Sequence, residues 1–586
     1  MQGGPPRSES KEMPAHPPFK RARDTSRYAD WNDRPAVQAF LGETETKQKE
    51  VAGELPFFAS SHATQPIPPW FPHDGLPAAY AQERVKEYPL GDFNPMLNTS
   101  SYVNVTFEPE EVAVAKLGMH VNIADQTIYA GSFRLHNDTL NMIADLWHCP
   151  RPASFEQYGC YPGAGTVGST EACLLAALAL KLRWRSWYAR TTGQSVAQVR
   201  GVYPNLVIST CFQACWEKFF RYMDVEPNFV APSVRTFAVD AKQIAAACNE
   251  RTIGVIAVLG NHYGGQYDPV RAISDELRAL NARTGWQIGI HVDAASGGFV
   301  APFRPSSTPW DFRVPAVLSI SASGHKFGES VCGTGWVVWR EREDLSEHVA
   351  VDVAYLGGKA ESFTLNFSRP ASGVYVQLYK FLRLGRDGYS RLTDNMLSTA
   401  HFLRTSLAAL RLPHGTNGGA NGEQRVLNGR RGDEGLDGNG STPIFTLLDA
   451  VGEAGCRAGA PGASWHSDCL PVVAACLNPE LELPFDCIDL QHVLAESHWY
   501  VSGYKMSFHH PESGELQPLF TDAPAERTML RIVVKSSLTR QLAGDLVASL
   551  EKAIGFLLLV GDGYAHMHAR SKTRTKEHAT SNGVVC

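Results

Sequence analysis

The sequence predicts an α/β fold, with a mostly parallel sheet in a large domain and a smaller α+β domain toward the carboxyl terminus. Apolar runs of strand length lie at 205–210, 235–239, 254–260, 286–292 and 314–320, and helical patterns separate several of them at 216–223, 241–249 and 270–283. Such alternation favours a parallel sheet covered by helices. The smaller domain is indicated by apolar runs at 443–448, 470–477 and 528–534 and by helical patterns at 486–497 and 540–558.

Size and composition exclude several classes of protein. The chain has 586 residues, enough for several cores, and a net charge of −6. A charge this mild implies no broad basic surface for nucleic acid or an anionic membrane, and no apolar run reaches the length of a membrane span. The 12 cysteines form no Cys-x-x-Cys pair, and residues 1–18 lack the apolar core of a secretory signal. We therefore expect a cytoplasmic protein with reduced thiols.

Changes in composition and in hydrophobic periodicity along the chain divide it into seven segments. Residues 1–85 are rich in proline and weak in periodicity, which predicts a disordered extension. A segment at 86–150, with a helix near 137–148, precedes the large domain at 151–370 and linking helices at 371–411. A flexible glycine-rich insertion is expected at 412–440, the small domain at 441–560, and a basic disordered tail at 561–586. The tail lacks the large apolar anchors of a calmodulin target, so calmodulin is not an expected partner.

A lysine and an aspartate close two apolar runs. Lys326 follows 314–320 through Ser321-Ala322-Ser323-Gly324-His325, and Asp293 follows 286–292. Ligands of parallel sheets gather at the carboxyl ends of the strands. A lysine there can hold pyridoxal phosphate (PLP) covalently, and a carboxylate can keep its pyridine nitrogen protonated. The pair predicts a PLP enzyme that acts at the α-carbon of an amino acid, without a metal, although Asp293 alone is equally typical of a turn before Gly297.

A glycine-rich stretch predicts where a phosphate would bind. Residues 163–171 contain three glycines with Ser169 and Thr170, and they run into an alanine- and leucine-rich helical pattern at 172–185. Free N–H groups and the positive end of the helix dipole favour phosphate at such a helix start. Glycine loops also serve as simple tight turns, so the motif acquires weight only from the lysine and the aspartate.

Longer blocks of sequence resemble the glutamate decarboxylases of bacteria and plants, which are group II PLP-dependent decarboxylases of fold type I. The resemblance covers about 98–558, and the matching blocks are 141–148, 215–222, 291–303, 310–313, 319–328 and 366–370. It implies decarboxylation of L-glutamate to 4-aminobutyrate and CO2. It also implies that the working form is a homo-oligomer, either a dimer or a hexamer.

The resemblance assigns roles residue by residue. It implies catalytic roles for Lys326, Asp293, His325 and Tyr355, the last on a mobile loop that closes over the site. It implies cofactor contacts from Ser169, Thr170, Gln213, His262, Ala295 and Ser323, and from Ser368 of the neighbouring subunit. It implies that Arg531 binds the α-carboxylate of the substrate and that Ser101, Asn122 and Asp125 bind the distal carboxylate.

Other interpretations of some of these residues stay open. His325 is equally typical of a hydrogen-bonded structural histidine, and Gln213 and Ser368 of polar residues on surface loops. Arg531 is harder to explain in that way, because an unpaired arginine in an apolar strand is costly and calls for a carboxylate partner.

Two stretches depart from the pattern of the family. His262-Tyr263-Gly264-Gly265 stands where the family typically reads Thr-Tyr-Thr-Gly, and Glu329-Ser330-Val331-Cys332 after the lysine is also atypical. These departures leave open another acidic substrate, such as aspartate or a sulfinate analogue. A non-catalytic paralogue is a further alternative, against which the intact lysine, aspartate and arginine argue.

Overall fold

The structure is a computed structural model, and it describes residues 55–304, 308–345, 349, 351–352, 361–412, 442–448, 469–561 and 563–564. The chain divides into two compact units, Met1–Asp92 and Phe93–Cys586. Among the described residues, none of the helices combines the length and the apolar character needed to cross a membrane.

The described part of the first unit contains short helical elements. These are η1 (Phe57–Ala59), η2 (Ser61–Thr64), α3 (Ala78–Lys86) and η3 (Tyr88–Gly91). Buried Tyr80 packs edge-on against Phe57, with ring centroids 5.5 Å apart, and its hydroxyl donates to the carbonyl oxygen of Leu55. At 55–85 this differs from the disordered extension that the sequence predicted for 1–85, and the rest of that segment, 1–54, lies outside the described residues. The two aromatic residues lie far apart in sequence, so their contact leaves no periodic pattern.

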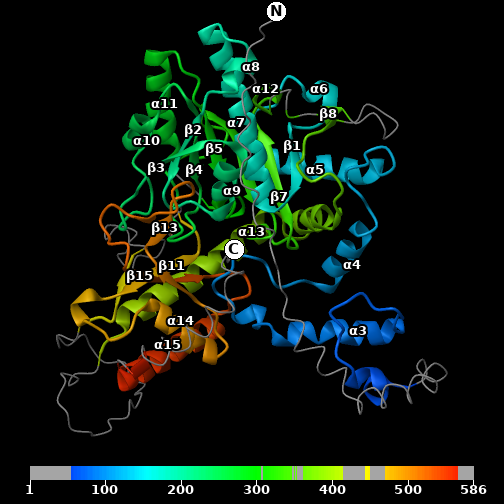
Figure 1. The fold of residues 1–586 in the computed structure, drawn as a ribbon, viewed down its shortest axis with the longest axis vertical. Helices are drawn as coiled ribbons and strands as arrows, with labels where there is room; N and C mark the ends of the chain where they lie inside the picture. Colours follow the sequence, from blue (N-terminus) through cyan, green and yellow to red (C-terminus); the bar gives the residue numbers. More distant parts are fainter. Residues whose placement is uncertain are drawn as a thin grey trace, which may run out of the picture. The chain divides into compact units, whose positions relative to one another are not determined.

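The second unit is built around a seven-stranded sheet in the order β1-β7-β6-β5-β4-β2-β3 (Figure 1). The strands are β1 (Gly163–Val167), β2 (Asn205–Ser209), β3 (Glu226–Val230), β4 (Thr252–Val258), β5 (Ile290–Asp293), β6 (Val317–Ser323) and β7 (Thr334–Trp339). Only β7 runs antiparallel to its neighbours within this sheet. The predicted mostly parallel sheet is therefore confirmed.

Helices cover both faces of this sheet because its strands are apolar on both faces. Successive residues of a strand point to opposite faces, so Leu206 and Ile208 join the core under α7 (Gly168–Thr192) and α9 (Ala214–Met223). Val207 instead joins the core on the opposite side. The helices of that side are α5 (Ala130–Leu146), α10 (Ala241–Ala247) and α11 (Val270–Thr284).

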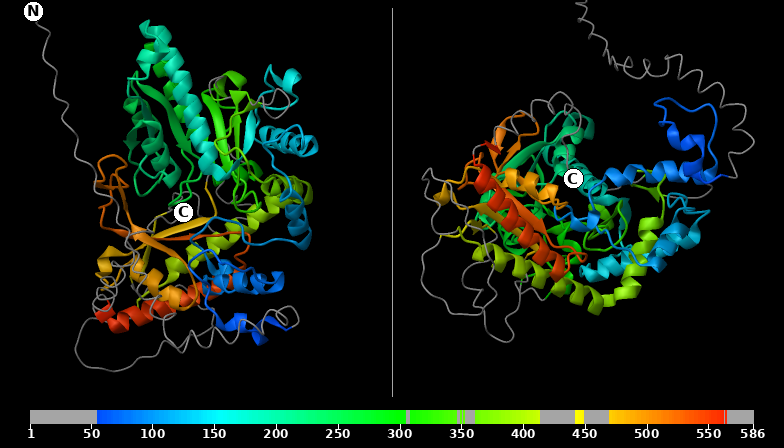
Figure 2. Two further views of the ribbon diagram at one scale, coloured as in Figure 1. Left: turned by 45° about the vertical axis from the view of Figure 1, so that its right-hand side comes forward. Right: turned by 90° about the horizontal axis from the view of Figure 1, so that it is seen from below.

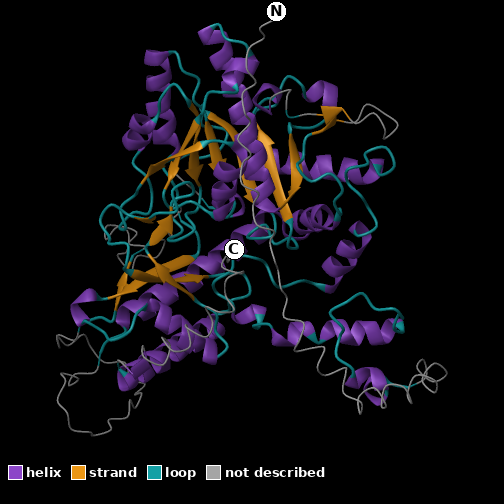
Figure 3. Ribbon diagram, viewed as in Figure 1, coloured by secondary structure: helices purple, strands orange, loops and turns teal. Residues whose placement is uncertain are grey.

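A smaller antiparallel sheet follows, in the order β10-β11-β15-β12, and Figure 3 shows it apart from the large one. Its strands are β10 (Phe445–Leu447), β11 (Val472–Leu477), β12 (Ser502–Lys505) and β15 (Thr528–Val533). Helix α14 (Cys487–Glu496) packs against β12 and β15, and α15 (Arg540–Val560) packs against α14. The hairpin β13 (Ser507–His509)–β14 (Leu516–Pro518) extends from it. This α+β arrangement agrees with the prediction for the carboxyl-terminal part.

A long helix, α13 (Ser372–Ala409), runs between the two sheets (Figure 2). It packs against α4 (Pro109–Gly118) and α5 at one end and against α15 and β10 at the other. Gly385 interrupts its helical geometry with φ 59° and ψ −173°. The remaining elements are η4 (Pro95–Leu97), α6 (Phe155–Tyr158), α8 (Val196–Val199), η5 (Gly297–Phe299), η6 (Ala301–Phe303), α12 (Arg342–Leu345), β8 (Val351–Asp352), β9 (Glu361–Ser362) and η8 (Pro479–Leu481).

The prediction of a strand at 235–239 is wrong. This segment forms a turn, in which Phe237 has a φ of 54°, and the strand beside β2 is β3. Strand β3 lies at the edge of the sheet and contains Pro227, which an edge position tolerates. Its partly exposed residues give a weak apolar signal, whereas the buried Phe237 and Val239 imitate a strand.

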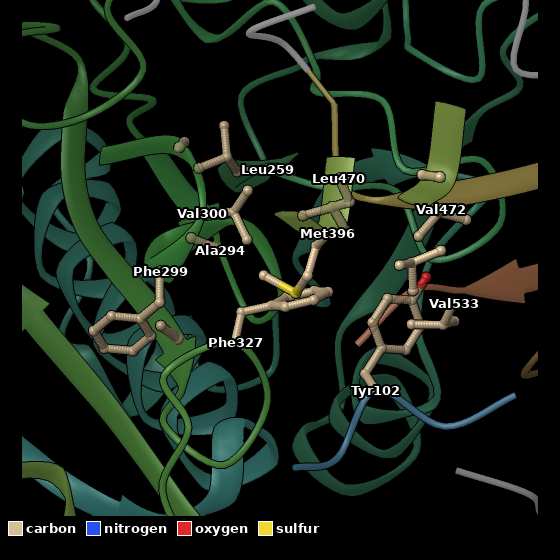
Figure 4. Packing of buried hydrophobic residues seen from close by; sticks show 14 of the residues in the cluster. Tyr102, Leu259, Ala294, Phe299, Val300, Phe327, Met396, Leu470, Val472 and Val533 are labelled. Atoms are coloured by element: carbon tan, nitrogen blue, oxygen red, sulfur yellow. The ribbon is translucent and has the colours of Figure 1, made fainter. Parts of the chain in front are cut away.

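One continuous apolar core joins the large sheet to the small one. Figure 4 shows part of it, with Leu259 and Ala294 near the ends of β4 and β5 and Leu470, Val472 and Val533 from the small sheet. Tyr102 and Phe327 belong to the same cluster. The carboxyl ends of the parallel strands are therefore held in a fixed position relative to β15.

Candidate active site

The predicted lysine and aspartate lie at neighbouring strand ends. Strands β5 and β6 are parallel, with Asp293 opposite Ser321, and Lys326 follows the end of β6. The Nζ atom of Lys326 donates to Oγ of Ser296 at 3.2 Å. Burial lowers the pKa of the Lys326 amine, and the nearby charge of Asp293 opposes this only in part. A lowered pKa increases the share of neutral amine, the form that attacks a carbonyl carbon.

Asp293 is held in one orientation. Its residue is 4% exposed, Oδ2 accepts a hydrogen bond from Nε1 of Trp216 at 2.8 Å, and Oδ1 accepts one from the backbone N–H of Ala295 at 3.1 Å. Trp216 belongs to α9 and is fully buried in the core between this helix and the sheet. The carboxylate is thereby fixed in a dry environment, where its effect on a bound cation is strong.

The start of α7 forms a setting for a phosphate group. The helix begins at Gly168, whose φ of 73° suits glycine, and Ser323 donates a hydrogen bond to Oγ of Ser169 at 2.7 Å. His325 lies against this start, since a Cβ atom on Gly168 would stand 3.4 Å from its Cε1. Thr170 occupies the next position of the helix. The free N–H groups of the first turn and these hydroxyls suit a phosphate.

His325 is a neutral member of this group. Its Nδ1–H donates to the carbonyl oxygen of Thr334 at 2.7 Å, which leaves Nε2 for another partner. Burial lowers the pKa of His325 to about 4, and the neighbouring charge of Lys326 adds to the shift. The ring therefore acts at neutral pH through hydrogen bonds and not through a positive charge.

Arg531 lies in β15 and is only 3% exposed. Nη1 donates to Nε2 of His262 at 2.8 Å and to its carbonyl oxygen at 2.9 Å. Nη2 donates to the carbonyl oxygen of Ser100 at 2.6 Å and to Oγ of Ser502 at 3.1 Å, and Nε has no hydrogen-bond partner among the described residues. All of these acceptors are neutral. A buried guanidinium with neutral partners and a free N–H is suited to receive an anion.

Tyr102 links Arg531 to Lys326, and sequence reasoning missed it. Its ring centroid lies 5.2 Å from Nζ of Lys326 and 5.3 Å from Cζ of Arg531, and its hydroxyl donates to the carbonyl oxygen of His262 at 2.9 Å. Only its position beside the predicted Ser101 pointed to this place. Trp216 was missed in the same way, although it follows closely after Gln213.

The remaining predicted residues form local hydrogen bonds at the start of α9 and in the segment around Asn122. Gln213 caps α9 through a hydrogen bond that its Oε1 accepts from the N–H of Cys215 at 3.0 Å. Asn122 donates to Oγ of Ser368 at 3.4 Å, and Oδ1 of Asp125 accepts from the N–H of Ile128 at 3.1 Å.

No hydrogen bond recorded for the described parts of the chain joins Asn122, Asp125 or Ser368 to the lysine. Ser101 lies in the segment of Tyr102, where its Oγ accepts a hydrogen bond from the N–H of Val103 at 3.2 Å. Tyr355 lies outside the described residues.

The residues present fit pyridoxal phosphate. A buried lysine with a lowered pKa can hold its aldehyde carbon, Asp293 is available for its pyridine nitrogen, and the start of α7 suits its phosphate. Ala295, two residues after Asp293, is small enough to lie under a ring. The fold and this group of side chains define a PLP-dependent enzyme.

Comparisons with known proteins identify the branch of this class. The model of the pyridoxal-dependent decarboxylase conserved domain matches residues 112–411. A glutamate decarboxylase of Arabidopsis thaliana is 39% identical over 60% of this chain and 69% of its own length. A probable glutamate decarboxylase of Listeria monocytogenes is 34% identical over 61% of this chain and 74% of its own length.

Solved structures agree with this result. The glutamate decarboxylase of Lactobacillus brevis superposes with a TM-score of 0.70 at 29% identity, over 86% of this chain and 98% of its own. The Oryza sativa TDC solved with PLP and tryptamine shares the fold, with a TM-score of 0.60 at 14% identity, over 93% of this chain and 100% of its own. The chain belongs to the family of pyridoxal-dependent decarboxylases, and its cofactor is pyridoxal 5′-phosphate.

Proposed function

We propose that this enzyme removes the α-carboxylate of L-glutamate and forms 4-aminobutyrate and CO2. The observation that carries the proposal is that Lys326 and the buried Arg531 lie beside the same ring, that of Tyr102. The lysine marks the reacting carbon, and the arginine offers a site for a carboxylate close to it. The relatives named glutamate decarboxylase support glutamate as the substrate.

The residues of the active site have separate roles in the proposed reaction. When bound, the cofactor accepts the electron pair that the departing CO2 leaves at the α-carbon. Asp293 holds the proton on the pyridine nitrogen, and the hydrogen bond from Trp216 keeps its carboxylate aimed there. Gln213 and Ala295 would hold the ring between them, one on each face. The phosphate is bound by Ser169, Thr170, Ser323 and His325.

The substrate is bound at its two ends. Arg531 binds the α-carboxylate beside His262, and Ser101, Asn122 and Asp125 bind the distal carboxylate. Tyr355 helps to return a proton to the α-carbon. The contact between Asn122 and Ser368 supports a shared task of these two residues, and we propose that they serve the site of a second subunit. The enzyme would then act as a homo-oligomer, a dimer or a hexamer, in the cytoplasm, where the free cysteines of the described residues remain reduced.

Product analysis tests the proposal directly. Full-length protein loaded with PLP is mixed with L-glutamate between mildly acidic and neutral pH, and the products are followed by NMR. We expect 4-aminobutyrate to appear in the same amount as glutamate disappears. If aspartate or a sulfinate analogue reacts and glutamate does not, the substrate is wrong while the decarboxylase chemistry stands. If PLP binds and no amino acid reacts, the catalytic proposal as a whole is overturned.

A further inference from the structure

Two cysteines from different helices lie beside the aspartate of the active site. Sγ of Cys173 in α7, Sγ of Cys215 in α9 and a carboxylate oxygen of Asp293 all lie within 4.8 Å of one another. The three residues are between 1% and 4% exposed. Their positions in the sequence show no ligand spacing, because the packing of α7 against α9 brings them together.

We propose that these three side chains form a binding site for a soft divalent cation, such as Zn²⁺ or Cd²⁺, in the protein without its cofactor. Two sulfurs and one carboxylate oxygen form a donor set that suits soft or borderline cations. Mg²⁺ and Ca²⁺ require six or more oxygen ligands, as a rule, and this place offers one carboxylate.

The geometry requires only a small adjustment. Bonds of about 2.0–2.3 Å to a tetrahedral cation place its ligands roughly 3.3–3.8 Å apart, which is about 1 Å less than the 4.8 Å limit that contains the three atoms. Rotation of the two thiols about χ1 can provide this movement. Asp293 stays in place, because Trp216 and the N–H of Ala295 each bond one of its oxygens.

The surrounding hydrogen bonds resemble the outer shell of a metal site. Sγ of Cys173 lies 3.3 Å from Oγ of Ser321, which in turn lies 3.0 Å from Nε2 of His291. Ligands that are themselves hydrogen-bonded are typical of metal sites in proteins. Binding breaks the two S–H bonds, forms two sulfur–metal bonds and releases two protons to solvent, so no oxidant is required.

The cation and the cofactor compete for Asp293. This part of the inference rests on the proposed function, in which the same carboxylate holds the pyridine nitrogen. A cation bound to Asp293 removes it from the cofactor, and it also places a positive charge near the amine of Lys326, whose pKa responds to Asp293, Cys215 and Cys173. PLP therefore protects the protein from the cation, and the cation slows loading with PLP.

Titration of the full-length protein with CdCl2 tests the site. The cofactor is first removed, and Cd²⁺ binding is followed by the ultraviolet sulfur-to-cadmium charge-transfer band and by proton release measured in two buffers. We expect one tightly bound equivalent and two released protons. Cys173→Ser and Cys215→Ser should each weaken binding by at least about 10-fold. Cys248→Ser is the matched control, because its thiol is also buried and donates a hydrogen bond to the carbonyl oxygen of Ile244.

The outcomes separate this inference from the proposed function. The site is overturned if unsubstituted protein shows no charge-transfer band, or if Cys248→Ser weakens binding as much as Cys173→Ser does. Circular dichroism and the visible absorbance after reloading with PLP verify folding, and the alanine variants replace any serine variant that fails there. If Cd²⁺ binds through both cysteines but preloaded PLP does not exclude it, the competition and the role of Asp293 are wrong while the metal site stands.

Discussion

Arg531 donates a hydrogen bond from Nη1 to Nε2 of His262 at 2.8 Å. The imidazole proton therefore lies on Nδ1. Burial, with the charges of Arg531 and Lys326, holds the pKa of His262 well below its ordinary value, so the ring is neutral at working pH. A neutral imidazole thus occupies a donor of the guanidinium that a carboxylate with two oxygens would use.

His262→Thr should improve substrate binding. The shorter side chain frees one N–H of Nη1 of Arg531, and one added hydrogen bond to a charged group contributes about 1.5 kcal/mol, which corresponds to roughly 10-fold in affinity. We expect a lower KM for glutamate and a smaller change in kcat. Steady-state kinetics measure both, with Tyr263→Phe as a control on the same loop. An unchanged KM would refute the obstruction by His262, and a raised KM would show that His262 assists binding.

Arg531→Gln should impair the substrate site and spare the cofactor. Loss of a buried charged partner of a carboxylate costs about 2–5 kcal/mol, so kcat/KM should fall by a factor between roughly 30 and several thousand. The visible absorbance of bound PLP should remain, because the arginine contacts Ser100, His262 and Ser502 and not the phosphate region. Loss of that absorbance along with activity would indicate a structural role instead.

Lys326→Ala should abolish both cofactor attachment and turnover. No other amine is expected to replace Nζ beside Ser296, so the visible absorbance of covalently held PLP should disappear. Lys326→Arg keeps the positive charge and serves as the comparison, since a guanidinium cannot form the same bond with an aldehyde. Spectra and product assays of the two variants measure the effect. Retained absorbance and turnover in either variant would move the attachment site elsewhere.

Glu329→Gln should flatten the pH dependence of stability. Burial raises the pKa of Glu329 from 4.5 to about 7. The folded state therefore binds this proton more tightly than the unfolded state. The stabilisation is complete below about 4.5, and it is lost as pH rises through about 7. This change in pKa corresponds to about 3 kcal/mol.

Polar and charged groups around Glu329 oppose this shift only in part. Its Oε2 accepts a hydrogen bond from Ser536 at 3.0 Å, which together with the charges of Lys380 and Lys535 lowers the pKa, whereas the charge of Glu111 raises it. Tyr389 is also close enough for its pKa to respond to Glu329. Thermal unfolding of the holoenzyme at pH 5 and pH 8 measures the difference, with the exposed Glu551→Gln as control. An equal pH dependence in wild type and Glu329→Gln would refute the assignment.

The central part of the fold could be predicted from local patterns. The run at 254–260 corresponds to β4, and the alanine- and leucine-rich pattern at 172–185 lies within α7. Lys326 and Asp293 could be singled out because each closes an apolar run. In contrast, β1 was taken as a glycine loop and β7 was not predicted, because the pairing of β1 with β7 and of β7 with β6 joins residues that are not adjacent in sequence.

The surroundings of the site escaped prediction for the same physical reason. Tyr102 meets Lys326 and Arg531 only after three distant segments have packed together, and no periodicity records such a meeting. The proximity of Cys173 and Cys215 likewise depends on how two helices pack. The departure at His262 was visible in the sequence, but its hydrogen bond with Arg531 was not.

Gly385 sets the direction in which α13 continues between the two sheets. Its φ of 59° and ψ of −173° are the mirror image of the extended conformation that ordinary residues of L chirality adopt. Within the described part of the chain, and apart from its own neighbours along the helix, no atom would lie within 4 Å of a Cβ at this position, so free space is not what restricts the choice of residue. The restriction is one of handedness: an achiral residue suits this joint, and an alanine there would be strained even with room for its methyl group.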